Sequence, residues 1–572
     1  MFWQIPWYLI ISAQLMVLSL ASLTAGLYLI QKNTSFFLEW NVTCWNSLSL
    51  DVTLLMDWMA LMFLSTVLFI SSMVSFYSNS YMQEDKSKIR FILLVTCFVL
   101  SMALLILSPN LVNVLLGWDG LGLVSYCLVI YYQNSKSASA GMITALSNRI
   151  GDVCLIISLS LAFYMGSFNF IFWTLQFNNN EMNMIIITLI VIAATTKKSA
   201  NSFLCLTPRS YSRPDPSPHA LVHSSTLVTA GVYLLIRFSP MIQEYNMSSY
   251  LLIMSTLTMF MAGLSANFEF DLKKIIALST LSQLGVMMFS ISLGMEMLAF
   301  FHLISHALFK ALLFLSAGLL IHNMNNTQDI RNLGSITLMF PLTSVVMNMA
   351  NLSLCGFPFL AGFYSKDLII EMNLSSNLNL FITSLLLIST SLTAIYSMRL
   401  TYFSMLNSFL NMSLNNCQEK DLHMNTPMYL MGVLSIVSGA SLMWLTLPVP
   451  TVIIMPPVMK ISVTLMVLSS LLMGVSLFQK THINQSLIIW FSSSMWFLPQ
   501  TSSFILTNPF MKTSKMFLKN QDQGWTEKLT AQGAHELLTL NSSHLQKIQN
   551  NSIKIFLILF LALSLPLMLT LI

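Results

Sequence analysis

Three ionisable side chains at even helical spacing stand out in the stretch Phe301–Phe314, which is otherwise largely apolar. His302, His306 and Lys310 follow one another at intervals of four residues. On an α-helix each such step advances by about 40°, so the three side chains lie along one stripe. Ionisable groups inside a bilayer cost several kcal/mol each unless they face partners or water. The spacing therefore predicts a polar track inside the protein.

Several kinds of chemistry fit such a stripe. Histidines four residues apart can ligate a metal, but Leu303 follows His302, so the zinc motif H-E-x-x-H is absent, and no carboxylate ligand lies nearby in sequence. Histidines from two spans can ligate haem, and buried histidines can pack against local partners. We favour proton transfer, because histidine titrates near neutral pH.

The composition indicates what surrounds this stripe. Of the 572 residues, 55% are hydrophobic and 8% are charged, whereas a soluble domain has about 25% charged residues. The chain is therefore a polytopic membrane protein. The net charge of +5 is modest and the basic residues are scattered, which gives no case for nucleic-acid binding. None of the seven cysteines forms a CxxC pair, so nothing favours a zinc or iron–sulfur site.

Apolar windows of roughly 17–25 residues recur almost end to end and predict an all-α protein with about 16 spans. The segment 500–552 differs, because it is polar with apolar residues near helical spacing. We interpret it as an amphipathic helix on the membrane or on neighbouring subunits, followed by a terminal anchor helix over 553–572. Residues 1–108 and 406–499 are expected to hold the other peripheral spans around a core at 109–405.

Further ionisable groups fall inside the predicted spans of the first half. Asp119 lies among glycines that let neighbouring backbones approach closely. Arg149 and Asp152, three residues apart, can neutralise one another as a structural ion pair. Lys198 ends an apolar run, and a buried lysine exchanges its proton readily because desolvation penalises the ammonium form. His223 places an imidazole in the next span.

The stretch Gly356–Asp367 reads as an interrupted span in the second half of the chain. Pro358 and three glycines open backbone hydrogen bonds, and an unwound stretch is tolerated where it lines a hydrated cavity. Lys366 follows this break, as Lys198 stands at the edge of the 197–218 region. Two interruptions that each carry a lysine suggest an internal inverted repeat.

These segments together resemble one family, subunit 5 of mitochondrial NADH:ubiquinone oxidoreductase, respiratory complex I. The motifs that carry the resemblance are Gly117–Tyr126, Ala220–Phe238, Asp271–Gly285, His302–Leu313 and Gly356–Asp367. The resemblance implies two inverted five-helix bundles, each with a broken helix, and a lateral helix that ends in an anchor. It also implies a translocase subunit that pumps protons, driven by quinone reduction elsewhere in the complex.

The resemblance also implies a role for each matching residue. Asp119 stands at the family's carboxylate position, which is more often Glu, and the shorter side chain reaches less far. The other positions of the implied proton relay are Lys198, His223, His302, His306, Lys310 and Lys366. In this mechanism a change in the Asp119–Lys198 interaction releases a proton toward the central stripe, and the proton leaves near Lys366.

The family further implies the chain's surroundings. The expected location is the mitochondrial inner membrane, with other membrane-arm subunits as partners, especially a neighbouring antiporter-like subunit along the lateral helix. No cofactor is expected on this chain, because NADH, FMN, iron–sulfur clusters and ubiquinone belong to other subunits. Two rival interpretations are a subunit of a multi-subunit sodium/proton antiporter, which shares the bundle, and a haem-bearing electron carrier.

One segment departs from the family pattern. After Lys198-Ser199-Ala200 the family has an apolar stretch with Trp-Leu-Pro and then Pro-Thr-Pro, whereas residues 201–219 here are rich in proline and arginine between matching flanks. We hypothesise that residues 199–219 are a locally frame-shifted reading, caused by compensating insertions or deletions. Translating the gene's other two frames should restore the family pattern; if neither frame does so, the hypothesis fails.

Overall fold

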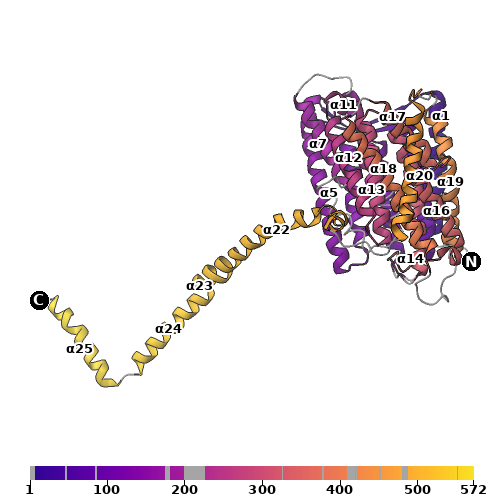
Figure 1. Cartoon of the computed structure of the whole chain (residues 1–572). Helices are drawn as coiled ribbons and strands as arrows, with labels where there is room; N and C mark the ends of the chain where they lie inside the picture. Colours follow the sequence, from indigo (N-terminus) through magenta and orange to yellow (C-terminus); the bar gives the residue numbers. More distant parts are fainter. Residues whose placement is uncertain are drawn as a thin grey trace, which may run out of the picture. The chain divides into compact units, whose positions relative to one another are not determined.

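In the computed structural model the described residues are 7–45, 48–83, 85, 87–173, 181–198, 226–324, 326–376, 379–408, 419, 421–447, 449, 452–479, 487–550 and 552–571. The chain divides into two compact units, unit 1 over Met1–Pro499 and unit 2 over Gln500–Ile572. Figure 1 shows unit 1 as a bundle of roughly parallel helices.

The longer helices of unit 1 supply its spans and packing. They are α1 (Trp7–Lys32), α2 (Trp58–Tyr81), α3 (Lys88–Leu107), α4 (Leu111–Val129), α5 (Ser135–Ala162), α7 (Glu181–Lys198), α10 (Leu227–Arg237), α12 (Ser248–Ala266), α13 (Leu272–Ser292), α14 (Glu296–Asn323), α16 (Pro341–Cys355), α17 (Ala361–Ser375), α18 (Leu380–Thr401), α19 (Leu422–Thr446) and α20 (Pro457–Gln479). Short elements join them: η1 (Phe163–Met165), α6 (Phe170–Trp173), α11 (Ser239–Glu244), α15 (Ile336–Met339), η3 (Tyr402–Leu406) and α21 (Leu487–Ser493).

A two-stranded hairpin, β1 (Phe36–Trp45) and β2 (Leu48–Met56), is the one departure from helix that the sequence did not lead us to expect among the described residues. Its aromatic and β-branched residues favour strands. Buried amides hold it to the bundle: Asn110 donates to the Asp51 carbonyl at 2.8 Å, and Thr53 donates to Asn169 at 3.1 Å. The hairpin thereby fixes the start of α4.

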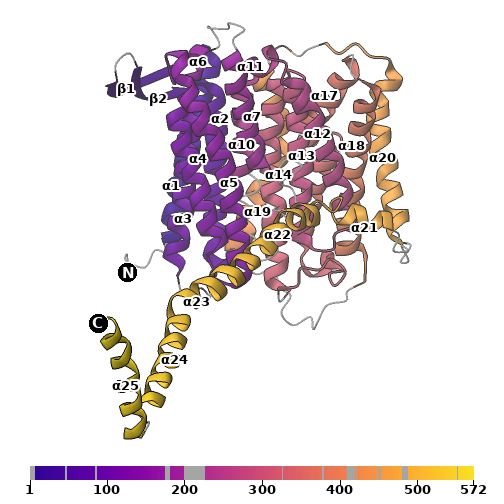
Figure 2. The same ribbon diagram turned by 90° about the vertical axis from the view of Figure 1, so that its left-hand side faces the viewer.

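Two isolated bridges reveal the internal repeat. The antiparallel bridge Asn110↔Asn169 joins the residue before α4 to the segment after α5, and Asp271↔Asp329 does the same around α13 and α14. The two bridges are offset by 161 residues on one side and 160 on the other. Figure 2 shows α6 and α11 at the same end of the bundle. Because α12 then crosses the bundle, the second bridge lies at the opposite end, as the predicted inverted repeat requires.

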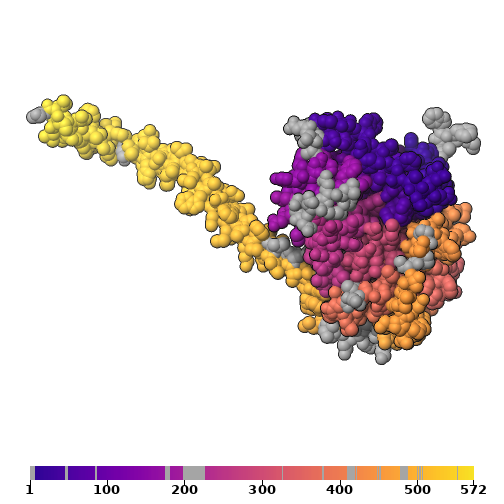
Figure 3. Space-filling view, turned by 90° about the horizontal axis from the view of Figure 1, so that it is seen from above, coloured from indigo at the N-terminus to yellow at the C-terminus, as the bar shows by residue number. Residues whose placement is uncertain are grey.

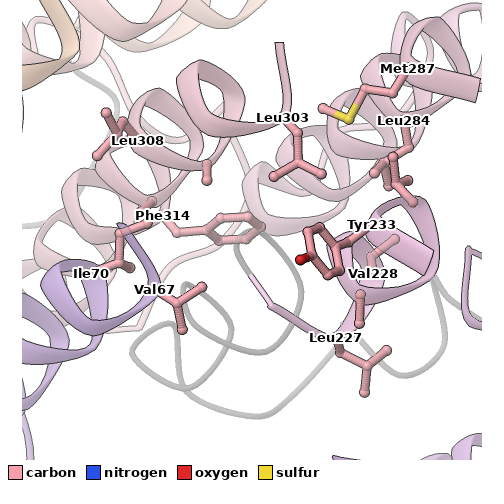
Figure 4. Packing of buried hydrophobic residues seen from close by; sticks show 14 of the residues in the cluster. Val67, Ile70, Leu227, Val228, Tyr233, Leu284, Met287, Leu303, Leu308 and Phe314 are labelled. Atoms are coloured by element: carbon pink, nitrogen blue, oxygen red, sulfur yellow. The ribbon is translucent and has the colours of Figure 1, made fainter. Parts of the chain in front are cut away.

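The ionisable stripe lies on a fully enclosed helix. The 18-residue apolar windows of α13 and α14 are 100% buried, whereas those of the other candidate spans are 22–78% buried. Figure 4 shows Phe314 of α14 between Val67 and Ile70 of α2 and Tyr233 of α10. In the space-filling view of Figure 3, N-terminal segments (indigo) adjoin C-terminal ones (orange), in keeping with the contact between α2 and α19. Segments from both halves of the chain therefore enclose α14.

Glycines allow the close helix contacts that the sequence predicted for α4. A Cβ atom added at Gly117 would lie 2.8 Å from the backbone nitrogen of Leu105, and one at Gly120 would lie 3.0 Å from the Ser101 Cβ. Only the absence of side chains lets α4 approach α3 this closely. This contact fixes the height of the intervening Asp119.

The predicted interrupted span breaks between α16 and α17. Gly356, at φ +80°, ends α16 in the left-handed conformation, and its N–H donates to Ser353 at 3.2 Å. Residues 357–360 are non-helical before α17 begins at Ala361. A Cβ at Gly362 would lie 1.7 Å from the Ser353 carbonyl oxygen. The first turn of α17 therefore rests directly on the end of α16.

Unit 2 is helical through most of its length. It contains most of α22 (Leu498–Phe517), then a π-helical stretch η5 (Leu518–Trp525), α23 (Thr526–Leu529), α24 (Ala531–Gln549) and α25 (Ile553–Leu569). The two glycines where breaks were expected mark local irregularities: Gly524 lies in η5, and Gly533 follows the non-helical Thr530. The apolar residues Trp525, Leu529, Leu538 and Leu545 are exposed.

The mostly helical membrane fold is confirmed. Eleven helices of the described residues are long and apolar enough to cross a membrane, or up to twelve if the bent pair Thr507–Gln549 and Ile553–Leu569 counts as one span. The predicted number of about 16 spans stays a prediction, because parts of several predicted spans lie outside the described residues. The division into five segments and the lateral placement of 500–552 also stay predictions.

The contact at the broken helix gives a first prediction. Gly362→Ala would force a methyl group into the Ser353 carbonyl and should cost about 3 kcal/mol through overpacking. The matched control is Gly432→Ala, where the nearest atom to an added Cβ is 3.9 Å away. The thermal midpoint of the assembled complex should fall for Gly362→Ala and stay unchanged for Gly432→Ala; equal midpoints would contradict the tight contact.

Candidate functional site

The site is a line of ionisable side chains in the interior of α14. His302, His306 and Lys310 are all at most 1% exposed. The enclosing side chains are contributed by α2, α10, α13, α16, α17 and α19. No solvent or lipid reaches the three groups directly, so each needs a polar partner inside the bundle.

His302 meets the broken helix. Its Nδ1 atom lies 2.9 Å from Ser365 Oγ of α17, and Ser305 donates to the same oxygen at 3.3 Å. One turn further along α14, the ring of His306 lies 6.1 Å from that of His302, centroid to centroid. Neither His306 nitrogen, nor His302 Nε2, has a hydrogen-bond partner among the described residues. Buried nitrogens of this kind are positions where ordered water is expected.

The two lysines of the second half are held by neutral oxygens. Lys310 donates to Ser279 of α13. Lys366 Nζ donates to Thr393 Oγ1 of α18 at 2.8 Å and reaches the Leu354 carbonyl at 3.4 Å. Among the described residues, no carboxylate lies within 4.0 Å of either amine. An amine without a counter-ion can exist in either protonation state without breaking an ion pair.

Adjacent residues of α17 join the line to both neighbouring helices. Ser365 bonds to α14 and Lys366 bonds to α18. Lys366 also interacts electrostatically with His302 and with Lys310. The break in the span makes this possible, because α17 begins in the membrane interior and presents its second turn at the level of α14.

The carboxylate of the first half has an arginine beside it. Arg149 Nη1 lies 3.1 Å from Asp152 Oδ2 and 4.0 Å from Asp119 Oδ2. The side chains differ in exposure: Asp152 is 6% exposed, Asp119 30% and Arg149 53%. Arg149 is therefore shared between the predicted ion-pair partner and the predicted relay carboxylate, which the sequence did not indicate.

The same helix α5 leads toward the position of Lys198. A Cβ at Gly151 would lie 2.4 Å from Thr196 Oγ1 of α7. This close approach places Asp152 beside the end of α7, two residues before Lys198. The side chain of Lys198 and the whole of His223 lie outside the described residues, as do residues 199–219, so their roles stay predictions.

Three hydroxyl partners were not identified from the sequence, namely Ser279, Ser365 and Thr393. Ser365 directly precedes Lys366, and Ser279 lies within the stretch Asp271–Gly285, but nothing in their types marks them. Each also lies near a backbone carbonyl of its own helix that its hydroxyl can donate to. That leaves the oxygen lone pairs free to accept from a neighbouring helix.

The described residues contain no group of three or more His, Cys, Asp or Glu side chains that could hold a metal ion. What the described line offers is a series of groups that can each take up and release a proton. Hydroxyls connect some of them, and the unpartnered imidazole nitrogens mark where water would connect the rest.

Comparison with protein families assigns the whole length of the chain. Residues 40–92 match the model "NADH-Ubiquinone oxidoreductase (complex I), chain 5 N-terminus". Residues 108–393 match "NADH:quinone oxidoreductase/Mrp antiporter, TM", and residues 396–571 match "NADH dehydrogenase subunit 5 C-terminus". The antiporter model contains every described residue of the line.

Curated relatives agree over nearly full length. The chain is 49% identical over 553 residues to NADH-ubiquinone oxidoreductase chain 5 of Anopheles gambiae, covering 96% of this chain and 95% of that protein. It is 49% identical over 565 residues to the Aedes aegypti protein of the same name, with coverage of 96% and 95%. Identity to the Lumbricus terrestris protein is 43% over 545 residues, with 92% of each covered.

A solved structure shares the fold. The Mrp complex from Dietzia sp. DQ12-45-1b aligns with a TM-score of 0.70 at 20% identity, covering 99% of this chain and 62% of that chain. Together with the relatives, this fold accounts for the inverted repeat, the broken helix and the buried line. The chain belongs to the NADH-ubiquinone oxidoreductase chain 5 family, the antiporter-like membrane subunits of the proton-translocating arm of complex I.

Proposed function

We propose that protons cross this translocase subunit through the buried line described above, with Asp119, Lys198 and His223 at one end and Lys366 at the other. A change at Asp119 and Lys198 releases a proton, which passes His223 and water to His306, His302 and Lys310. The proton leaves near Lys366. The observation that carries this proposal is that Ser365 and Lys366 of one interrupted helix meet both α14 and α18.

Arg149 gives the first step a physical basis. Its guanidinium lies within 4.0 Å of Asp119 and closer to Asp152. A shift of Arg149 fully toward Asp152 would leave the Asp119 carboxylate free to attract the Lys198 ammonium, and the reverse shift would release it. Such an exchange needs only side-chain rotation and is driven by whichever charge the neighbouring subunit presents.

We further propose the setting of this activity. The chain acts in the mitochondrial inner membrane and carries no redox centre, while NADH, FMN, iron–sulfur clusters and ubiquinone are bound by other subunits. Its basis is that every proposed role on this chain is met by acid–base groups. A visible absorption spectrum of the isolated chain checks this, since bound haem or iron–sulfur clusters would absorb.

Replacing Lys366 tests the relay. Lys366→Met removes the exchangeable proton, and Lys366→Arg keeps a positive charge that cannot be released. Both should lower the number of protons pumped per NADH oxidised, with pumping-coupled turnover reduced by about tenfold or more. The measurement is proton uptake against NADH oxidation in sealed vesicles.

The matched control is Ser389→Ala, a buried serine of α18 whose hydroxyl donates only to its own helix at Leu386. It should pump normally. If Lys366→Arg pumps as well as the unsubstituted protein, the residue serves as a fixed charge and the relay ends elsewhere. Native gels confirm that each variant is assembled.

We also propose that α24 binds a neighbouring antiporter-like subunit through Leu538 and Leu545, which lie on one helix face and are 69% and 59% exposed. Leu538→Asp should weaken retention of that subunit in the purified complex, because it buries a charge at the interface. Ser543→Asp, on the opposite face of α24, is the matched control. Equal retention in both variants would argue that this face contacts lipid alone.

A further inference from the structure

A cavity extends from the broken helix along α16 and α18. Its volume is about 270 Å³. Along α16 it is lined by Asn348, Asn351 and Cys355, which lie on one helical stripe, and along α18 by Ser397 and Thr401. Both stripes run from the break toward the end of the bundle where α16 begins, and Thr337 of α15 and Leu406 of η3 line that outer end.

The polar lining makes this cavity a place for water. Asn351 is 4% exposed, faces the cavity, and its Nδ2 atom has no hydrogen-bond partner among the described residues. An unpaired buried amide costs about 1–3 kcal/mol, which a water would recover. A cavity needs roughly 10–15 Å³ to hold one water, and purely apolar cavities of about 150 Å³ stay dry. This cavity exceeds the first limit many times over and differs from the second class through its amides and hydroxyls.

The inner end of the cavity lies beside the lysines. Cys355 Sγ and Ser397 Oγ, both lining residues, are 2.8 Å apart. Lys366 reaches the carbonyl of Leu354, the residue before Cys355, and its Cδ atom lies 3.8 Å from where a Gly356 Cβ would be. Cys355 interacts electrostatically with both Lys310 and Lys366. The thiol and hydroxyl therefore separate the cavity from the two amines.

We propose that this cavity is a water-filled vestibule that gives Lys310 and Lys366 access to the membrane surface where α16 begins, with the Cys355–Ser397 pair as its narrow inner end. The inference rests on the proposed function, because it adds an aqueous route to the lysines of that relay. The surface concerned is the one that carries the Asp271↔Asp329 bridge.

The vestibule also explains why α16 is short. Because α16 stops at Cys355 inside the membrane, the thiol sits at the level of the lysines while the rest of its stripe, Asn351 and Asn348, leads outward. The distance from Cys355 to Asn348 along the helix is about 10 Å. A continuous span would have closed this route with another turn of side chains.

Thiol labelling of the whole complex in sealed vesicles tests the proposal. The probes are a membrane-impermeant quaternary-ammonium methanethiosulfonate and a lipophilic maleimide, and mass spectrometry quantifies modification of the Cys355 peptide. The impermeant probe should modify Cys355 from one side of the vesicle and not from the other. Cys97 and Cys127, exposed on the spanning helices α3 and α4, are the reference thiols.

Two variants test whether the cavity is the route. Thr401→Phe fills the outer half and Asn351→Leu removes its amide, and each should slow labelling by the impermeant probe about tenfold, since thiol exchange depends on access. Thr383→Phe, on α18 outside the cavity, should leave the rate unchanged. Asn351→Leu conserves volume, so it keeps the test informative if Thr401→Phe fails to assemble.

The opposite results are equally definite. Labelling by the lipophilic probe alone would mean that an acyl chain fills the cavity, and no labelling by either probe would mean that it is closed; both overturn the proposal. The labelling rates do not depend on pumping. A labelled Cys355 in a complex whose Lys366→Met variant pumps normally would keep the vestibule and reject the relay.

Discussion

The burial of amines and imidazoles without counter-ions is the constraint on which the rest of unit 1 depends. Lys310 and Lys366 lie in the membrane interior, where an isolated charge is costly, and the described partners are the neutral oxygens of Ser279 and Thr393. A carboxylate partner would hold each ammonium in one state. Hydroxyl partners solvate the amine while leaving both protonation states accessible, which suits groups that pass protons on.

This constraint determines the architecture around the line. Because the ionisable helix must not face lipid, α13 and α14 are completely enclosed by other helices. Because Lys366 must reach both α14 and α18, its span is interrupted, and Gly356 and Gly362 make the interruption possible through a left-handed cap and a contact that admits no Cβ. Serines that donate to their own backbone supply oxygens at the helix contacts without leaving a donor unpaired.

The two halves of the chain meet this constraint in different ways. In the second half the described cations have neutral partners, whereas in the first half Arg149 is shared between Asp119 and Asp152. The repeat therefore preserves the backbone, as the equivalent bridges around α4–α5 and α13–α14 demonstrate, while the local electrostatics diverge. A bistable carboxylate pair at one end and counter-ion-free amines at the other favour transfer from the first half toward the second.

The sequence by itself determined the membrane class, the interrupted span at Gly356–Leu360 and the shared stripe of His302, His306 and Lys310, because hydropathy, helix-breaking residues and four-residue spacing act locally along the chain. It did not indicate the hairpin at 36–56, since short strands of mixed polarity resemble a loop between spans. Only the tertiary structure decided which hydroxyls hold the lysines, that Arg149 lies beside Asp119, and that a cavity ends at Cys355. Each of these depends on side chains more than 25 residues apart meeting across helix contacts, and no local pattern encodes the register of those contacts.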